Sequence, residues 1–144
     1  MTVPDPIEWL KTARQGMSTS LLGQLGGEFV SVDEDSLTIR LPISEATRQP
    51  FGLVHGGINL YLIETVASSH AAYGLDLNQK VPVGIEVSAS HMRSATKGTL
   101  VATARQLRRG NTHAVHEVDI SLEETGELLS RGRMTNYYKT VSGG

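Results

Sequence analysis

The sequence predicts an α+β fold in which one long buried helix is wrapped by an antiparallel sheet of five or six strands. Residues 58–73 are good helix formers and apolar on nearly every face, as is typical of a helix buried by its neighbours. Six strand-like segments flank this helix in the sequence, and short polar or glycine-rich stretches join most of them, as in hairpins. A helix layer packed on one sheet follows from this pattern.

We expect one domain over residues 1–144, whose first 36 residues form a helix and a loop leading into the fold. Residues 6–15 predict the helix, because Pro6 suits a first helical position and the apolar side chains are spaced about one turn apart. Residues 16–27 are rich in Ser, Thr and Gly, which predicts a loop or loose turn.

Two strands are expected before the long helix, at about residues 28–32 and 36–41. In the second, apolar and polar residues alternate cleanly, which predicts a half-buried strand, and Pro42 ends it. The turns between the strands after the helix carry Gly and polar residues, so we expect those strands to form an antiparallel meander. They are expected at about residues 81–93, 98–107, 112–122 and 128–138.

Composition excludes several functional classes. The formal net charge of −2 and a pI near 6.2 argue against a general nucleic-acid binder, which needs a concentrated basic surface. No cysteine is present, so disulfides and a cysteine nucleophile are absent. The first residues lack the basic start and apolar core of a signal peptide, and no apolar run approaches the roughly 20 residues of a membrane span. We therefore expect a cytoplasmic protein without a membrane partner.

Residues 49–57, QPFGLVHGG, lead directly into the expected long helix and end in two glycines. The first N–H groups of a helix have no internal partner, and the helix dipole adds about half a positive charge there. A carbonyl oxygen that becomes an oxyanion would be stabilised at Gly56 and Gly57. The stretch is therefore a candidate active site.

Glu64 is out of place in an apolar helix, and a buried carboxylate has to be paired or hydrogen-bonded. Ser68, one turn later, is the nearest group on the same face, and a structural Glu64 bonded to it is the alternative to a catalytic one. Gly56 and Glu64 are eight residues apart, or roughly 12 Å along a helix, so within one chain they cannot both contact the same substrate carbonyl group. A shared reaction therefore implies a homodimer whose active site is shared between the chains.

At these residues the sequence resembles the hotdog-fold acyl-CoA thioesterases of the phenylacetate-degradation (PaaI-like) type, and among them the 1,4-dihydroxy-2-naphthoyl-CoA thioesterases of menaquinone biosynthesis. The resemblance runs from about residue 37 to residue 136. It implies an acyl-CoA substrate, no cofactor other than the coenzyme A of that substrate, and a homotetramer built from two dimers. The matching motifs are QPFGL at 49–53, HGG at 55–57, Glu64 with Ser68, GIE at 84–86 and HMRSA at 91–95.

The resemblance also implies roles for individual residues. Glu64 is the nucleophile or the general base, and the Gly56 N–H polarises the thioester carbonyl. Gln49 and His55 orient substrate or water, and Ser68 helps to place the attacking group. For His55 the sequence leaves two readings: a ring that bonds the backbone and fixes the Gly56 geometry, which we favour, or a ring that touches the thioester.

Coenzyme A carries a 3′-phosphate and a pyrophosphate, which call for cations and backbone donors near the pocket. His91 and Arg93 match the family at one strand end. Arg109 and two neighbouring arginines lead into the next turn, where charged side chains are also ordinary solvated surface, and Asn111 and Thr112 fall where related enzymes touch the nucleotide. The substrate-binding candidates are thus His91, Arg93, Asn111, Thr112, Arg109 and, as the aromatic lining of the acyl pocket, Phe51 and Tyr61.

The favoured function is hydrolysis of an aromatic acyl-CoA, such as 1,4-dihydroxy-2-naphthoyl-CoA or a hydroxybenzoyl- or phenylacetyl-CoA-like thioester. Two alternatives stay open: a non-catalytic acyl-CoA or acyl-carrier binding module, and a hotdog enoyl-CoA hydratase or dehydratase. Glu64 counts against the first, and the absence of an acidic partner for His55 counts against the second. No Gly-x-Ser-x-Gly elbow is present, which excludes an α/β-hydrolase mechanism. We expect no metal site, because His113 and His116 face opposite sides of their strand.

Overall fold

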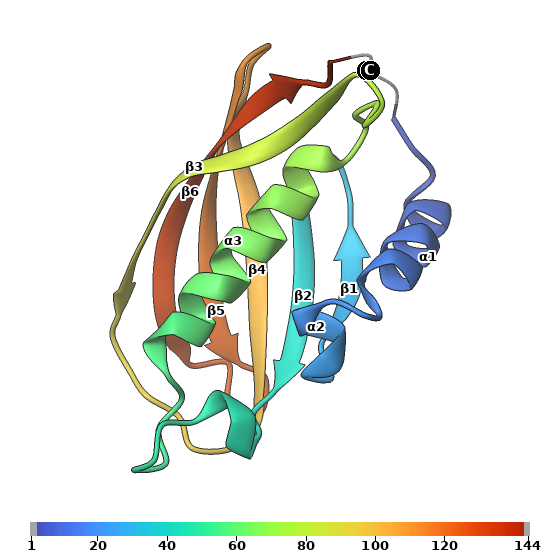
Figure 1. The fold of residues 1–144 in the computed structure, drawn as a ribbon. Coiled ribbons are helices and arrows are strands. Elements are labelled where there is room, and N and C mark those ends of the chain that lie inside the picture. Colours follow the sequence, from blue (N-terminus) through green and yellow to red (C-terminus); the bar gives the residue numbers. More distant parts are fainter. Residues whose placement is uncertain (1–2, 143–144) are drawn as a thin grey trace.

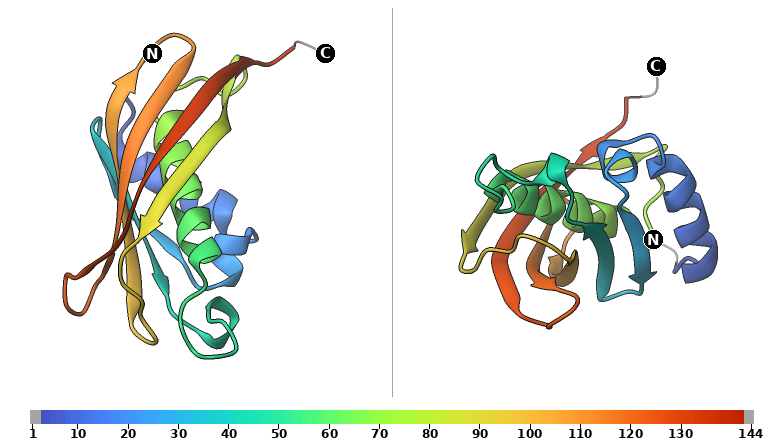
Figure 2. Two further views of the ribbon diagram at one scale, coloured as in Figure 1. Left: turned by 90° about the vertical axis from the view of Figure 1, so that its left-hand side faces the viewer. Right: turned by 90° about the horizontal axis from the view of Figure 1, so that it is seen from below.

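A computed structural model describes residues 3–142, in which one long helix, α3 (Gly56–Ala72), lies across one face of a six-stranded antiparallel sheet (Figure 1). The ends of the expected domain, residues 1–2 and 143–144, lie outside the described residues. Seen from below, the sheet curves around the helix (Figure 2). The predicted α+β class and hotdog arrangement are confirmed. The strands are β1 (Glu28–Val32), β2 (Ser36–Pro42), β3 (Lys80–His91), β4 (Thr99–Arg109), β5 (His113–Leu122) and β6 (Leu128–Thr140).

The strand order is β1-β2-β4-β5-β6-β3, so the predicted meander is correct for β4, β5 and β6 and wrong for β3. β3 pairs with β6 at the far edge of the sheet, because the place beside β4 is taken by β2. Residues 92–98 are therefore a connection between distant strands and not a hairpin turn. The carbonyl of Ala95 in this connection accepts a hydrogen bond from the Val54 N–H, 3.0 Å away, which ties it to the segment before α3.

The concave face of the sheet and the inner face of α3 form the core. Leu37, Ile39 and Leu41 of β2 are fully buried, as their alternation predicted, and they belong to one hydrophobic cluster with Leu62 and Ile63 of α3. Burying each such side chain contributes about 1.5–3 kcal/mol. This packing fixes the position of α3, and therefore of the groups at its N-terminus.

The N-terminal region covers the β1 edge of the sheet. α1 (Pro6–Met17) begins as predicted and ends two residues later, and Asp5 caps it by accepting a hydrogen bond from the Ile7 N–H at 2.9 Å. The stretch predicted as a loop contains a short helix, α2 (Leu21–Gln24). That helix forms because Leu22 is drawn into the core, where only 1% of it stays exposed.

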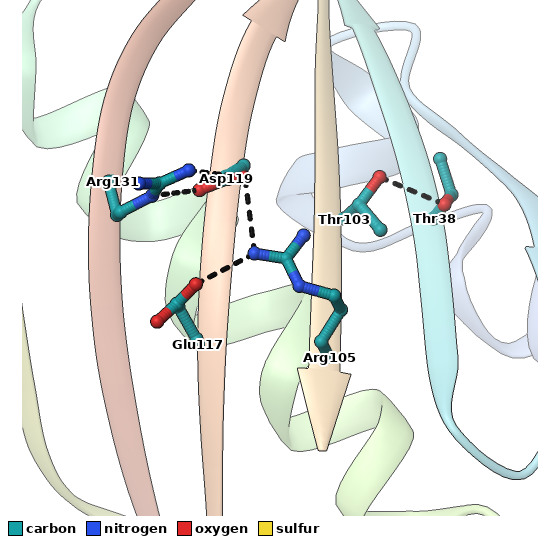
Figure 3. A network of polar contacts seen from close by, with 6 residues as sticks. All are labelled: Thr38, Thr103, Arg105, Glu117, Asp119 and Arg131. Atoms are coloured by element: carbon teal, nitrogen blue, oxygen red, sulfur yellow. Dashed lines mark hydrogen bonds and ion pairs between the residues drawn. The ribbon is translucent and has the colours of Figure 1, made fainter. Parts of the chain in front are cut away.

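The convex face of the sheet, away from α3, carries a network of ion pairs (Figure 3). Arg105 of β4 donates to Glu117 and Asp119 of β5, at 2.8 and 3.1 Å, and Arg131 of β6 donates to Asp119 at 2.6 Å. These contacts bridge three adjacent strands. They also occupy Arg105, one of the two arginines that precede Arg109 before the turn to β5.

Candidate active site

The N-terminus of α3 presents an open backbone donor. His55 is the N-cap residue, and its Nδ1 accepts a hydrogen bond from the Gly57 N–H at 2.8 Å. The ring thus hydrogen-bonds to the backbone, as the favoured interpretation of His55 expects. The Gly56 N–H, one residue earlier, has no hydrogen-bond partner within residues 3–142. Capping therefore satisfies the second N–H of the helix and leaves the first available to a ligand, at the positive end of the helix dipole.

A cavity of about 300 Å³ lies beside this helix end. It brings together five of the predicted site residues, from the loop before α3, the first turn of α3, the end of β3 and the connection that follows β3. Apolar side chains, among them Leu53, Leu100 and Leu129, form much of the remaining wall. The cavity combines an apolar lining with the open N–H of the helix, which suits an acyl group attached to a polarised carbonyl. The five predicted residues are Gln49, Phe51, Gly56, His91 and Arg93.

His91 is held close to Gly56. A Cβ built on Gly56 would lie 3.0 Å from Nε2 of the His91 ring, so the absence of a side chain at residue 56 makes room for it. On its other side, His91 Nδ1 is 2.8 Å from Oγ of Ser130, and Asn59 Nδ2 donates to the same Oγ at 3.1 Å. Sequence reasoning missed Asn59 and Ser130. The available signal was a polar residue three positions after Gly56, which places Asn59 on the same helix face.

Glu64 is exposed in this chain, which corrects the expectation of a buried carboxylate. Ser68 does not bond it either, since the Ser68 hydroxyl donates to Oδ1 of Asn136 at 3.0 Å. The reason is that the Glu64 side of α3 faces β3, the last strand of the sheet, so no further strand covers it. The carboxylate lies against Gly84, where a Cβ would come 2.5 Å from Oε2.

The remaining predicted residues lie away from the Gly56 cavity. Arg109 donates to the carbonyl oxygens of Tyr73 and His70, both at 2.6 Å, and so satisfies the C-terminal end of α3. Arg109 and Asn111 line a separate cavity of about 460 Å³. Thr112, the residue after Asn111, is exposed. The 17 residues of α3 separate the two cavities by roughly 25 Å along the helix axis. One chain therefore does not bring Arg109, Asn111 and Thr112 to Gly56.

The two predicted aromatic lining residues differ in their surroundings. Phe51 lines the Gly56 cavity but is 68% exposed. Tyr61 is half-buried and packs against the hydrophobic core instead of lining that cavity. In a single chain, the aromatic residue that lines the cavity is therefore largely open to solvent.

Two buried histidines lie under the C-terminal half of α3. His70 Nε2 donates to the carbonyl of Asp33 at 2.9 Å, since a carbonyl can only accept. Its Nδ1 then accepts from His116 Nε2 at 2.8 Å. Burial lowers the pKa of His116 to about 3, helped by the positive charge of Arg109 and by the charge that His70 would carry if protonated, and burial also lowers the pKa of His70. Both rings are therefore neutral at pH 7 and serve the fold.

β3 forms an open edge of the sheet. This 12-residue strand pairs with β6 on one side only, and Val83 and Ile85 are 40% and 57% exposed. A long edge strand with exposed apolar side chains invites pairing with another strand. In the part of the chain that the structure describes, no helix is long and apolar enough to cross a membrane. Within the same residues, no group of three or more His, Asp or Glu side chains could hold a metal ion.

Comparisons with known proteins agree on one family. A model of the thioesterase superfamily matches residues 51–129, which is more than half of the chain. A 1,4-dihydroxy-2-naphthoyl-CoA hydrolase of Escherichia coli (strain K12) is 34% identical over 116 residues, covering 81% of this chain and 84% of that protein. A protein of the same name from Listeria monocytogenes is 36% identical over 111 residues, covering 77% and 89%.

A solved structure is similar over almost the whole chain. The crystal structure of a mutant thioesterase from Pseudomonas aeruginosa superposes with a TM-score of 0.88 at 31% sequence identity, and the match covers 97% of both chains. The similarity therefore extends beyond the matched family region to the N-terminal helix.

Proposed function

Because the chain belongs to the thioesterase superfamily and is a thioester hydrolase, we propose that it cleaves acyl-CoA to a free acid and coenzyme A. The observation that carries this proposal is the Gly56 N–H, which has no partner among residues 3–142, lies at the N-terminus of α3 and lines a largely apolar cavity of about 300 Å³ beside His91. A backbone donor in that position is suited to a carbonyl oxygen that gains negative charge.

In the proposed reaction, the carbonyl oxygen of the thioester accepts a hydrogen bond from Gly56 N–H. Attack on the carbonyl carbon moves charge onto that oxygen, where the helix dipole and the N–H stabilise it. The C–S bond then breaks, and the thiolate of coenzyme A leaves and takes up a proton. Glu64 either attacks the carbon, giving an anhydride that water opens, or removes a proton from the attacking water. Both routes use the same residues.

Glu64 is proposed to act on the substrate bound at Gly56 of a second chain. Eight residues of helix separate the two groups by roughly 12 Å, whereas both have to lie within about 3 Å of the reacting atoms. The exposure of Glu64 beside Gly84 supports this arrangement, because the open edge strand β3 would bring a second chain to that carboxylate. The resulting homodimer, and the homotetramer of two such dimers that the resemblance implies, are part of the proposal.

Antiparallel pairing of two copies about a two-fold axis would also bring opposite ends of the two α3 helices together. Asn111 and Thr112 of one chain would then approach the cavity of the other. The cavity at that end also includes Lys80, a cation suited to a phosphate group. We propose that this end contributes to binding the nucleotide part of coenzyme A, while His91 and Arg93 contact the substrate nearer the thioester.

We propose an aromatic acyl group as the substrate, because the E. coli and L. monocytogenes relatives are named for a dihydroxynaphthoyl thioester. The apolar cavity wall fits a ring, and Phe51 supplies an exposed aromatic surface beside it. Relatives named as hydrolases weigh against both alternatives, the non-catalytic binding module and the enoyl-CoA hydratase. The cytoplasmic location expected from the sequence stays a prediction.

The function is tested by following thiol release from a panel of aryl- and alkyl-CoA thioesters with a thiol reagent. The chain has no cysteine, so the protein gives no background. We expect release from aromatic thioesters, and a loss of at least about a hundredfold in Glu64→Gln. Glu8→Gln, which changes an exposed glutamate on α1, is the matched control and should keep full activity. Absence of thiol release from every thioester would overturn the proposal.

A further inference from the structure

Three hydrogen-bonded polar side chains, Asn59, Ser130 and His91, form a row that ends at the N-terminus of α3 in the proposed site. Asn59 is 6% exposed and Ser130 is fully buried. Asn59 Nδ2 lies 3.1 Å from Ser130 Oγ, and that oxygen lies 2.8 Å from His91 Nδ1. Asn59 also lines the cavity beside Gly56, and its buried Oδ1 has no partner in residues 3–142.

The chemistry of these groups sets the direction of both hydrogen bonds. An amide NH₂ can only donate, so the Ser130 oxygen accepts from Asn59. The Ser130 hydroxyl proton then needs an acceptor, because a buried donor without one costs about 1–3 kcal/mol. Among the described residues, His91 Nδ1 is the one other side-chain atom within hydrogen-bonding distance of the Ser130 oxygen. His91 Nδ1 therefore accepts, and a neutral His91 carries its proton on Nε2.

The opposite orientation of the Asn59 amide is less favourable. It would place the NH₂ group, with two donors, where the buried Oδ1 now lies without a partner. The present orientation leaves one N–H and the carbonyl oxygen unpaired, whereas the opposite one leaves two N–H groups unpaired. Buried unpaired carbonyl oxygens are commoner in proteins than buried unpaired N–H groups, so the orientation with Nδ2 toward Ser130 is favoured.

We propose that Asn59 is a positioning residue that acts through Ser130 to hold His91 with its proton on Nε2, next to the Gly56 N–H. His91 Nε2 lies 3.0 Å from the Cβ position of Gly56, so its proton can reach the same carbonyl oxygen as the Gly56 N–H. The oxyanion then has two donors. The other tautomer would turn a nitrogen lone pair toward the developing negative charge. The donor role rests on the proposed hydrolysis, whereas the tautomer can be measured without it.

Asn59→Asp provides a sharp test because it keeps the shape but removes the donor. An ionised carboxylate only accepts, so the Ser130 hydroxyl would donate to it, and His91 would have to donate from Nδ1 to Ser130. The tautomer is read from ¹⁵N chemical shifts of histidine-labelled protein, in which His91→Gln identifies the signal among five histidines. We expect Nε2 protonation in the wild type and Nδ1 protonation in Asn59→Asp.

The same variant should lower kcat by about a hundredfold to a thousandfold with little change in KM, since one oxyanion donor is lost. Ser130→Ala breaks the relay by a second route and should give a mixture of the two tautomers. A wild-type His91 protonated on Nδ1, or the same tautomer in wild type and Asn59→Asp, would overturn the relay. If the tautomer changes as expected while the wild type releases no thiol, the relay stands and the hydrolase function is the part that fails.

Discussion

The Glu64 carboxylate lies directly against Gly84 of the edge strand β3, where a Cβ would come 2.5 Å from Oε2. Only a residue without a side chain allows this approach. The contact places an exposed carboxylate beside the open edge of the sheet, within reach of a chain that pairs there. The position of Glu64 is therefore set jointly by α3 and by a glycine twenty residues later.

Gly84→Ala should lower kcat by about tenfold, because the added methyl group displaces the Glu64 carboxylate from its position. The fold should survive, since the other close contact of that methyl group is the flexible end of Met134. Steady-state kinetics and a thermal melt measure the two effects. Gly16→Ala in α1 is the control, because nothing lies within 4 Å of its Cβ position. Wild-type kcat in Gly84→Ala would contradict a constrained catalytic carboxylate.

Gly56→Pro removes the proposed oxyanion donor and leaves the helix able to start. Proline suits the first helical position, and His55, at φ −67° and ψ 129°, already has the extended conformation required before proline. Loss of one such donor should lower kcat by about a hundredfold to a thousandfold. Gly56→Ala is the matched variant, since it adds a Cβ near His91 and keeps the N–H. Equal kcat values for the two variants would argue against the N–H.

Two substitutions at His55 separate its cap from a direct catalytic contact. His55→Ala removes the acceptor for the Gly57 N–H and should lower the free energy of unfolding by about 1 kcal/mol. Asparagine is a good N-cap, so His55→Asn should restore stability. If the cap is what fixes Gly56, activity should recover together with stability. Recovered stability without recovered activity would instead show that the imidazole itself touches the thioester. Urea denaturation and thiol release measure the two properties.

The buried pair His70 and His116 should make stability fall in acid. Both pKa values are lowered in the folded state, so below about pH 6.5 the unfolded chain binds more protons than the folded one. The stability that the neutral pair contributes is thus fully present above that pH. It is lost as the pH falls below it, by up to about 1.4 kcal/mol per pH unit for each histidine. His116→Asn should make the free energy of unfolding, measured by urea denaturation, depend less steeply on pH, whereas the exposed His113→Asn should leave this dependence unchanged. An unchanged slope in His116→Asn would contradict the assignment.

The sequence was enough to predict the elements that depend on local patterns. The alternation in β2 and the apolar length of α3 were read correctly, and so was the glycine turn at Gly56, because each follows from neighbouring residues. The position of β3 could not be read in the same way. Residues 92–98 look like a hairpin turn locally, and only pairing between distant strands moves β3 to the far edge.

The site was predicted in part for a similar reason. Gln49, Gly56 and His91 meet at one cavity, as the motifs indicated. The prediction that Glu64 is buried was wrong, because the composition of the helix does not reveal that one of its sides faces the last strand of the sheet. Asn59 and Ser130 are 71 positions apart, and their hydrogen bond exists only once α3 lies across β6.

The central claim, a hydrolytic site built from Gly56 of one chain and Glu64 of another, is tested most directly by mixing two inactive variants. Gly56→Pro and Glu64→Gln are unfolded together, refolded as a mixture and assayed for thiol release. Random pairing makes half of the dimers mixed, and each mixed dimer has one site with both groups intact. We predict about a quarter of wild-type activity in the mixture. Activity no higher than that of the separate variants would contradict a shared site.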